Sequence, residues 1–141
     1  MSGPIYFPME KVEGIRSKVM AFTAQTPEII DAMSMGLSEE ELHRRPAPDQ
    51  WGIVELICHL SDTDKLAFRA RIEAMLEKDR APLSAIDPNA LAEKYKYIQR
   101  TFADAIAGFR SSRGESLRII QQVSQEQWNR VGIHPRFGET S

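Results

Sequence analysis

Apolar side chains recur every three or four residues along most of the chain, which is the spacing of one face of an α-helix. The first such stripe comprises Val12, Ile15, Val19, Phe22, Thr26, Ile29 and Met33. The stripe keeps its phase across Pro27, and it therefore predicts one kinked helix instead of two separate helices. Gly36 follows the last apolar position and can end this helix.

A second stripe predicts a helix over residues 52–78, which at 1.5 Å per residue would be roughly 40 Å long. Its apolar positions are Ile53, Leu56, Ile57, Leu60, Ala67, Ala70, Ala74 and Met75. The next segment, residues 79–86, contains a proline and is expected to be a loop.

A third helix is predicted to begin after Asp87, which can cap it, with Pro88 in the first helical position. Its stripe comprises Leu91, Tyr95, Ile98, Phe102, Ala105, Phe109, Ser112, Ser116, Ile119 and Val123. Every step is three or four residues, so one long helix is expected. Two glycines weaken it and predict a bend near residues 111–114.

Two short capped segments follow the first and third helices. Ser38 with Glu41 can form a reciprocal helix cap, and Ser124 with Gln127 repeats the pattern 86 residues later. The same offset from the start of the second helix leads to Gly138, where a fourth helix should begin. No strand-like alternation is evident. We therefore expect a single all-α domain over residues 1–141, a helix bundle with three long helices and the fourth missing at the C-terminal end.

Composition excludes several classes of protein. The chain has 141 residues, of which 42% are hydrophobic, which suits one domain with its own core. The formal net charge is −2 and the charged residues are mixed, which argues against a nucleic-acid partner. The charged stretches at residues 39–41 and 110–118 are expected to be solvated faces. No apolar run is long enough to span a membrane, no secretory signal is evident, and the single cysteine, Cys58, favours a cytoplasmic protein.

Three segments together resemble the DinB-like superfamily, the damage-inducible proteins with their thiol-transferase relatives. The segments are WGIVELICHL at residues 51–60, LSEEEL at residues 37–42, and the stretch over residues 128–138. In order and spacing the resemblance covers nearly the whole chain, and it is strongest over residues 37–70 and 123–138. The family usually has serine where Gly52 stands, and glycine can also cap a helix.

The resemblance implies an up-down-down-up four-helix bundle with a metal site of three histidines. One of them comes from helix two, at the position that His59 matches. The other two lie four residues apart on helix four, and nothing in this sequence matches them. A divalent metal, zinc or nickel, is thus implied for the complete family fold, and we expect none in this chain alone.

His59 is therefore the principal candidate for a metal ligand. Glu55, Asp62 and Thr63 lie within one turn of it and could orient the imidazole, and either carboxylate could be a second ligand. The alternative is a half-buried helix histidine that bonds Asp62, Thr63 or water.

The remaining candidates have simpler interpretations. Ser112 and Ser116 could line a polar pocket between the second and third helices, or they could be small residues at a close helix approach. Cys58 is expected to be a buried thiol. His134 precedes a proline, so we expect it in a solvated loop, and His43 is expected at the surface.

Two functions remain open from the sequence. The resemblance implies a metal-dependent hydrolase, or a transferase that passes a small thiol to an electrophile, acting on a small molecule. The alternative is a binding module without catalysis. In either case three amphipathic helices leave an apolar groove, which a homodimer could cover.

Overall fold

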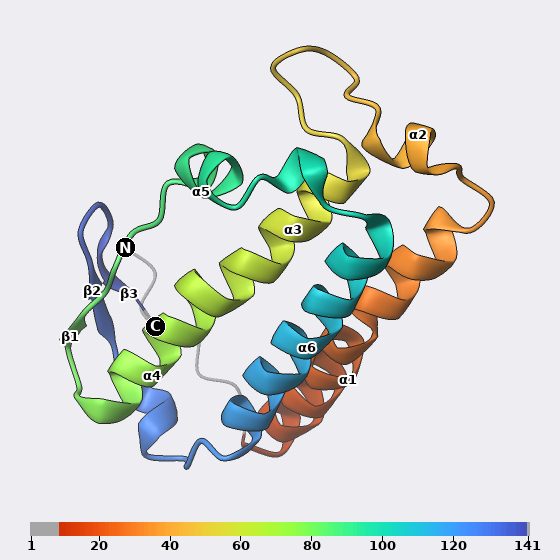
Figure 1. Cartoon of the computed structure of the whole chain (residues 1–141). Coiled ribbons are helices and arrows are strands. Elements are labelled where there is room, and N and C mark those ends of the chain that lie inside the picture. Colours follow the sequence, from red (N-terminus) through yellow and green to blue (C-terminus); the bar gives the residue numbers. More distant parts are fainter. Residues whose placement is uncertain (1–8, 141) are drawn as a thin grey trace.

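Three helical columns form the body of the protein, in the computed structural model that describes residues 9–140, with side chains from residue 14 onward (Figure 1). The first is α1 (Met9–Ser34), the second runs through α3 (Ile53–Thr63) and α4 (Ala70–Glu77), and the third is α6 (Phe102–Gln121). α6 packs against α3 on one side and α1 on the other. The predicted bundle of three long helices is confirmed, and Val12 and Ser141 lie outside the residues whose side chains are described.

The second column is continuous from residue 53 to residue 77, as its stripe predicts. Gly52 precedes it in an extended conformation, and the Glu55 carboxylate accepts a hydrogen bond from the Gly52 amide at 2.9 Å. Between α3 and α4 lies a π-helical turn, Asp64–Arg69. Such turns shift the register of the side chains that follow, and they are frequent at functional positions.

The third predicted helix is wrong in its first half. α5 (Pro88–Lys94) ends early, Lys96 takes a left-handed backbone with φ 51°, and a 3₁₀ turn, η2 (Tyr97–Gln99), follows. Thr101 then caps α6, its hydroxyl accepting from the Asp104 amide at 3.1 Å. The apolar stripe hides this break because its phase continues across it. α6 stays helical without a break across residues 111–114, where the two glycines predicted a bend.

Three short strands close one end of the bundle, against the expectation of no strands. β1 (Ala81–Pro82) pairs in parallel with β2 (Gly132–His134), and β2 pairs antiparallel with β3 (Gly138–Thr140). Gly138 thus starts a strand, where the internal repeat predicted a fourth helix. Each strand has two or three residues, too few to show an alternating pattern in the sequence.

The short capped segments adopt different lengths. Ser38 and Glu41 form the predicted capping box at the start of α2 (Glu39–His43). Ser124 and Gln127 make the same reciprocal hydrogen bonds, and they begin only a 3₁₀ turn, η3 (Gln127–Asn129). In Figure 1 α2 and the sheet lie at opposite ends of the α3–α4 column.

The core lies between α3 and α6 and extends to the loops around them. Its buried members are Leu42, Val54, Ile57, Cys58, Tyr97, Ala105, Ile106 and Phe109. The apolar stripe of α1 takes no part in it: Phe22 is 69% exposed and Met33 is 78% exposed. Leu56, Leu60 and Phe68 on the second column are also exposed, so apolar side chains remain uncovered on both outer columns.

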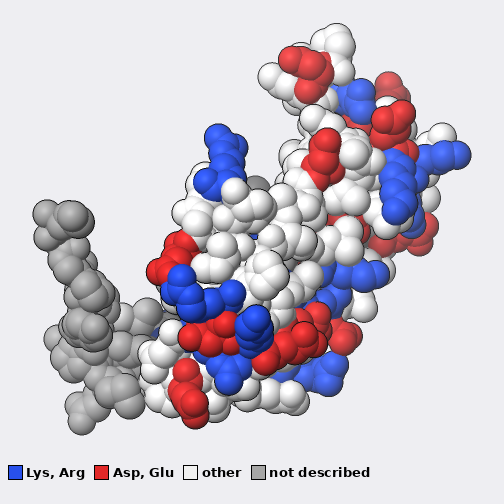
Figure 2. Space-filling model, turned by 90° about the vertical axis from the view of Figure 1, so that its left-hand side faces the viewer, with Lys and Arg blue, Asp and Glu red and all other residues white. Residues whose placement is uncertain are grey.

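On the face seen in Figure 2, basic and acidic side chains are interspersed, and they form no large patch of one charge sign. None of the helices described is both long and apolar enough to cross a lipid bilayer.

Candidate functional site

His59 lies on α3, half-buried, beneath the indole of Trp51. The two ring centroids are 5.0 Å apart, and Nδ1 of His59 lies 3.4 Å from the Thr63 hydroxyl. Burial lowers the pKa of the imidazole, and the negative charge of Asp62 partly opposes that shift. The ring is therefore neutral near pH 7, the state in which histidine binds metals. With Nδ1–H donating to Thr63, Nε2 would present its lone pair.

Asp62 is fixed by a residue from another element. The Tyr97 hydroxyl donates to its Oδ2 at 2.5 Å, and the Tyr97 ring meets Trp51 edge-on with centroids 6.3 Å apart. Burial, and then the hydrogen bond to Asp62, raise the pKa of Tyr97, so the phenol keeps its proton and acts as donor. Tyr97 is absent from the predicted site because the sequence places it within an unbroken helix.

Glu55 has a structural role instead of the predicted place beside His59. Arg45 donates to both of its carboxylate oxygens, and the Gly52 amide donates to Oε2. The hydrogen bond from Arg45 lowers the pKa of this buried carboxyl against the effect of burial. Both carboxylate oxygens of Glu55 are thus hydrogen-bonded to Arg45 or to the backbone at the start of α3.

A second buried carboxylate, Asp64, is held by Arg113 across the α3–α6 seam. Arg113 Nε lies 2.6 Å from Oδ2 and its terminal nitrogen 3.2 Å from Oδ1, while NH1 donates to the Thr23 carbonyl of α1 at 2.9 Å. The side chains of Arg113 and Asp64 are 14% and 8% exposed. The prediction of a solvated face over residues 110–118 is therefore wrong at Arg113.

The two serines of the predicted pocket are both buried in the seam. The Ser112 hydroxyl donates to the Ser61 carbonyl at 3.1 Å, whereas the Ser116 hydroxyl has no hydrogen-bond partner among the described residues. A cavity of about 250 Å³ opens further along α6 toward its start, and neither serine lines it. Its wall includes Cys58, Asp62, Lys65, Tyr97, Arg100 and Asp104.

Cys58 is a buried thiol, as predicted. Burial raises its pKa to about 11, so it carries no thiolate near pH 7. A nucleophilic or metal-binding role requires the thiolate.

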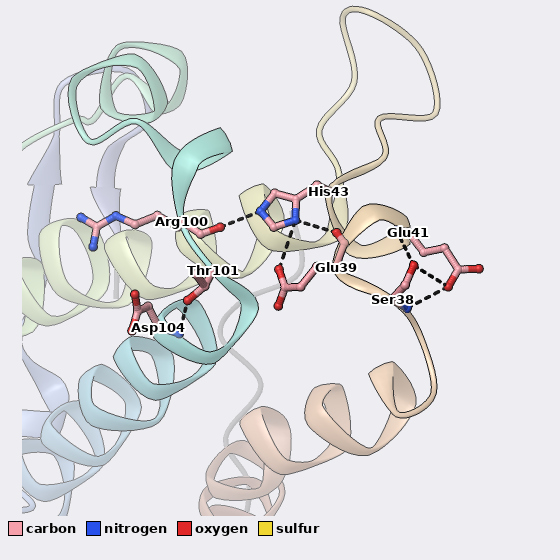
Figure 3. Close-up of polar contacts among 7 residues, drawn as sticks. All are labelled: Ser38, Glu39, Glu41, His43, Arg100, Thr101 and Asp104. Carbon is pink, nitrogen blue, oxygen red and sulfur yellow. Dashed lines mark hydrogen bonds and ion pairs between the residues drawn. The ribbon is translucent and has the colours of Figure 1, made fainter.

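His43 is more firmly held than a surface histidine would be. Its Nδ1 lies 2.7 Å from the Glu39 carbonyl oxygen and its Nε2 lies 2.6 Å from the Arg100 carbonyl oxygen (Figure 3). Carbonyl oxygens only accept, so both ring nitrogens must donate, and these two bonds raise the pKa of His43. The two bonds tie α2 to the turn that precedes α6.

His134 lies in β2 and is buried, not in a solvated loop. Its Nδ1 accepts hydrogen bonds from the Arg136 and Phe137 amides at 3.1 and 3.3 Å, and its ring stacks on Phe137. It belongs to the sheet end of the molecule, away from the Trp51 that covers His59.

The described residues do not fit a metal ion unaided. No group of three or more histidine, cysteine, aspartate or glutamate side chains is gathered for metal binding in the described part of the chain. Zinc sites use at least three protein ligands, and here His59 is one.

The family model of the DinB superfamily matches residues 23–141. The chain belongs to the DinB superfamily. Its structure resembles that of YfiT from Bacillus subtilis, described as a probable metal-dependent hydrolase with an unusual four-helix bundle topology, with a TM-score of 0.78 and 15% identity over 96% of this chain and 74% of YfiT. The comparison with curated proteins gives no match. At this identity, the likeness to YfiT shows the fold alone.

Proposed function

We propose that this DinB-superfamily chain belongs to a metal-dependent hydrolase or small-thiol transferase in which His59 is one metal ligand. The observation that carries the proposal is the state of that imidazole: half-buried, neutral, with Nδ1 beside Thr63. No partner of its Nε2 is found among the described residues. The description of YfiT as a probable metal-dependent hydrolase supports the same class of activity.

In this proposal Thr63 and Asp62 support the ligand. Thr63 would accept from Nδ1–H and so direct the lone pair of Nε2 outward. Asp62, fixed by Tyr97, adds negative charge beside His59. A complete site needs at least two ligands beyond those that the described residues gather around His59, and a second copy of the chain is one source of them.

The test is metal binding by purified protein, measured by equilibrium dialysis against Zn²⁺ or Ni²⁺ with elemental analysis. We expect one metal per site, lost in His59→Ala and weakened roughly tenfold in Thr63→Val, because supporting residues contribute on the order of 10–100-fold to affinity. His134→Asn, at a histidine distant from the site, is the matched control and should bind as the wild type does. Unchanged binding in His59→Ala would sink the proposal.

A second candidate function is a homodimeric binding module without catalysis. The exposed apolar stripe of α1, which includes Ile15, Val19 and Phe22, favours it, since large uncovered apolar patches mark interaction surfaces. A copy of the chain seated on this stripe would bury it through a two-fold interface.

Sedimentation of the wild type and two α1 variants separates this candidate from a monomer. Phe22→Asp should shift a dimer to monomer, whereas Gln25→Asp, a charge placed at an exposed polar position of the same helix, should leave it intact. A wild type that stays monomeric at high concentration would exclude the homodimer.

A further inference from the structure

A second cavity lies at the sheet end of the molecule, between α4, the end of α6 and the strands. Its volume is about 440 Å³, within the range of small-molecule sites. Most of its wall is apolar, built from Phe68, Ile72, Met75, Leu76, Leu83, Ile120, Val123, Trp128 and Phe137. The wall therefore suits an apolar body and contributes little to the binding of a polar one.

One buried polar side chain in this wall, His134, makes its described hydrogen bonds through one ring nitrogen. His134 is 9% exposed, and its Nδ1 accepts from two backbone amides, so the ring proton is on Nε2. Nε2 has no partner among the described residues. An acceptor atom of a molecule bound in the cavity can therefore take a hydrogen bond from Nε2–H.

The charges around the cavity are of one sign. Arg71 and Arg130 line it, and no aspartate or glutamate does. Arg130 is anchored by donating to the Met75 and Leu76 carbonyls at 3.2 and 2.5 Å, and Nε of Arg71 donates to the Ser84 carbonyl at 3.2 Å. Both guanidinium groups are therefore held at the wall, where they favour an anion.

We propose that this cavity binds an amphiphilic carboxylate, a small molecule with an apolar chain and one carboxylate head. The chain fills the apolar wall, Nε2–H of His134 donates to a carboxylate oxygen, and Arg71 and Arg130 stabilise the negative charge. The site is separate from His59, which lies under Trp51 on α3. It requires neither a metal nor a second copy of the chain.

Titration with three probes that have a ten-carbon chain, each below its micelle concentration or solubility limit, tests this assignment. Decanoate, decan-1-ol and decyltrimethylammonium share a chain and differ in the head group, and Trp128 in the wall reports occupancy by its fluorescence. We expect decanoate to bind at least about tenfold more tightly than the alcohol, because a hydrogen bond to a charged group is about twice as strong as a neutral one and the guanidinium charges add to it. The cation should bind most weakly. Equal affinities for decanoate and the alcohol would overturn the proposal.

Variants then locate the contact. In His134→Asn the amide oxygen can still accept from the two backbone amides, while the Nε2–H donor is lost, so decanoate should bind about tenfold more weakly. Val123→Trp fills the cavity and should abolish binding of all three probes. If His134→Asn does not fold, Arg71→Gln replaces it and should weaken decanoate more than decan-1-ol. The site is refuted if decanoate binds unchanged to His134→Asn, or to Arg71→Gln where that variant replaces it. It is also refuted if decanoate still binds to Val123→Trp.

Discussion

α6 is held by different forces on its two sides. Toward α3 the contact has an apolar centre, with Val54, Ile57 and Phe109 fully or almost fully buried, and the buried Arg113–Asp64 pair lies beside it. Toward α1 the described contacts include charged and polar groups: Arg110 pairs with Glu28 and Asp31. The apolar stripe of α1 points away from α6 into solvent.

This difference distinguishes the contacts that stabilise the isolated chain from the exposed apolar surface of α1 that a partner could cover. Burial of apolar area is the main favourable term in folding, so the α3–α6 seam supplies most of the stability. Exposed ion pairs contribute little by themselves, so the α1–α6 contact fixes position more than it stabilises. The amphipathic pattern of α1 is satisfied only when something covers its stripe.

The largest expected effect comes from removing an aromatic ring from the α3–α6 seam, compared with removing one from the exposed stripe of α1. Phe109 is 0% exposed, so Phe109→Ala should lower the free energy of unfolding by about 4 kcal/mol. Phe22 is 69% exposed, so Phe22→Ala should change it by less than about 0.5 kcal/mol in a monomer. Urea unfolding measures both. Comparable losses, independent of protein concentration, would show that the α1 stripe is buried within one chain.

Removing the buried guanidinium should have the next largest effect. Arg113→Ala leaves the Asp64 carboxylate buried and unpaired, which should cost about 3 kcal/mol. The matched control is Arg110→Ala, one turn earlier on α6, where solvent screens the lost ion pairs and the loss should be far smaller.

A double variant sharpens the same point. Asp64→Leu combined with Arg113→Met removes both charges and should be less destabilising than Arg113→Ala alone. If the double variant is the less stable one, the pair itself, and not the cost of an unpaired charge, stabilises the seam.

The smallest effect is a pH dependence at the start of α6, where His43 bonds the Arg100 carbonyl. The folded pKa of His43 is raised above its ordinary 6.5, so its stabilising effect is complete below pH 6.5 and is lost as pH rises through the folded value. His43→Gln should remove that alkaline loss, worth less than about 1 kcal/mol at this partly exposed position.

His59 should show the opposite sign in the same measurement. Its folded pKa is lowered, so the protein loses stability as pH falls from 6.5 toward the folded value, and His59→Gln should remove that acidic loss. Urea midpoints over the range from about pH 5 to about pH 9 distinguish the two histidines. The quantity compared is the difference in stability between the wild type and each variant as a function of pH. If this difference changed with pH in the same direction for both variants, the assigned pKa shifts would be contradicted.

Local signals in the sequence predict most helix ends. Ser38 with Glu41, and Asp87 before Pro88, cap helices where expected, because a cap depends on atoms within three residues of one another. Thr101 is a cap of the same kind, but the apolar stripe that continues across it favours an unbroken helix. A threonine followed three residues later by an aspartate, as in Thr101 and Asp104, is a helix-start signal that can be found in the sequence.

The sequence alone determined the helical class, the family and the position of His59, because periodicity, caps and short motifs are local properties of the chain. Only the tertiary structure decided what surrounds these residues. Tyr97 reaches Asp62, and Arg113 reaches Asp64, across 35 and 49 residues. Such contacts depend on how helices rotate and where loops return, and no spacing in the sequence encodes either. For the same reason the sequence did not predict that Glu55 belongs to a helix cap, or that His134 lies in the wall of a cavity instead of a solvated loop.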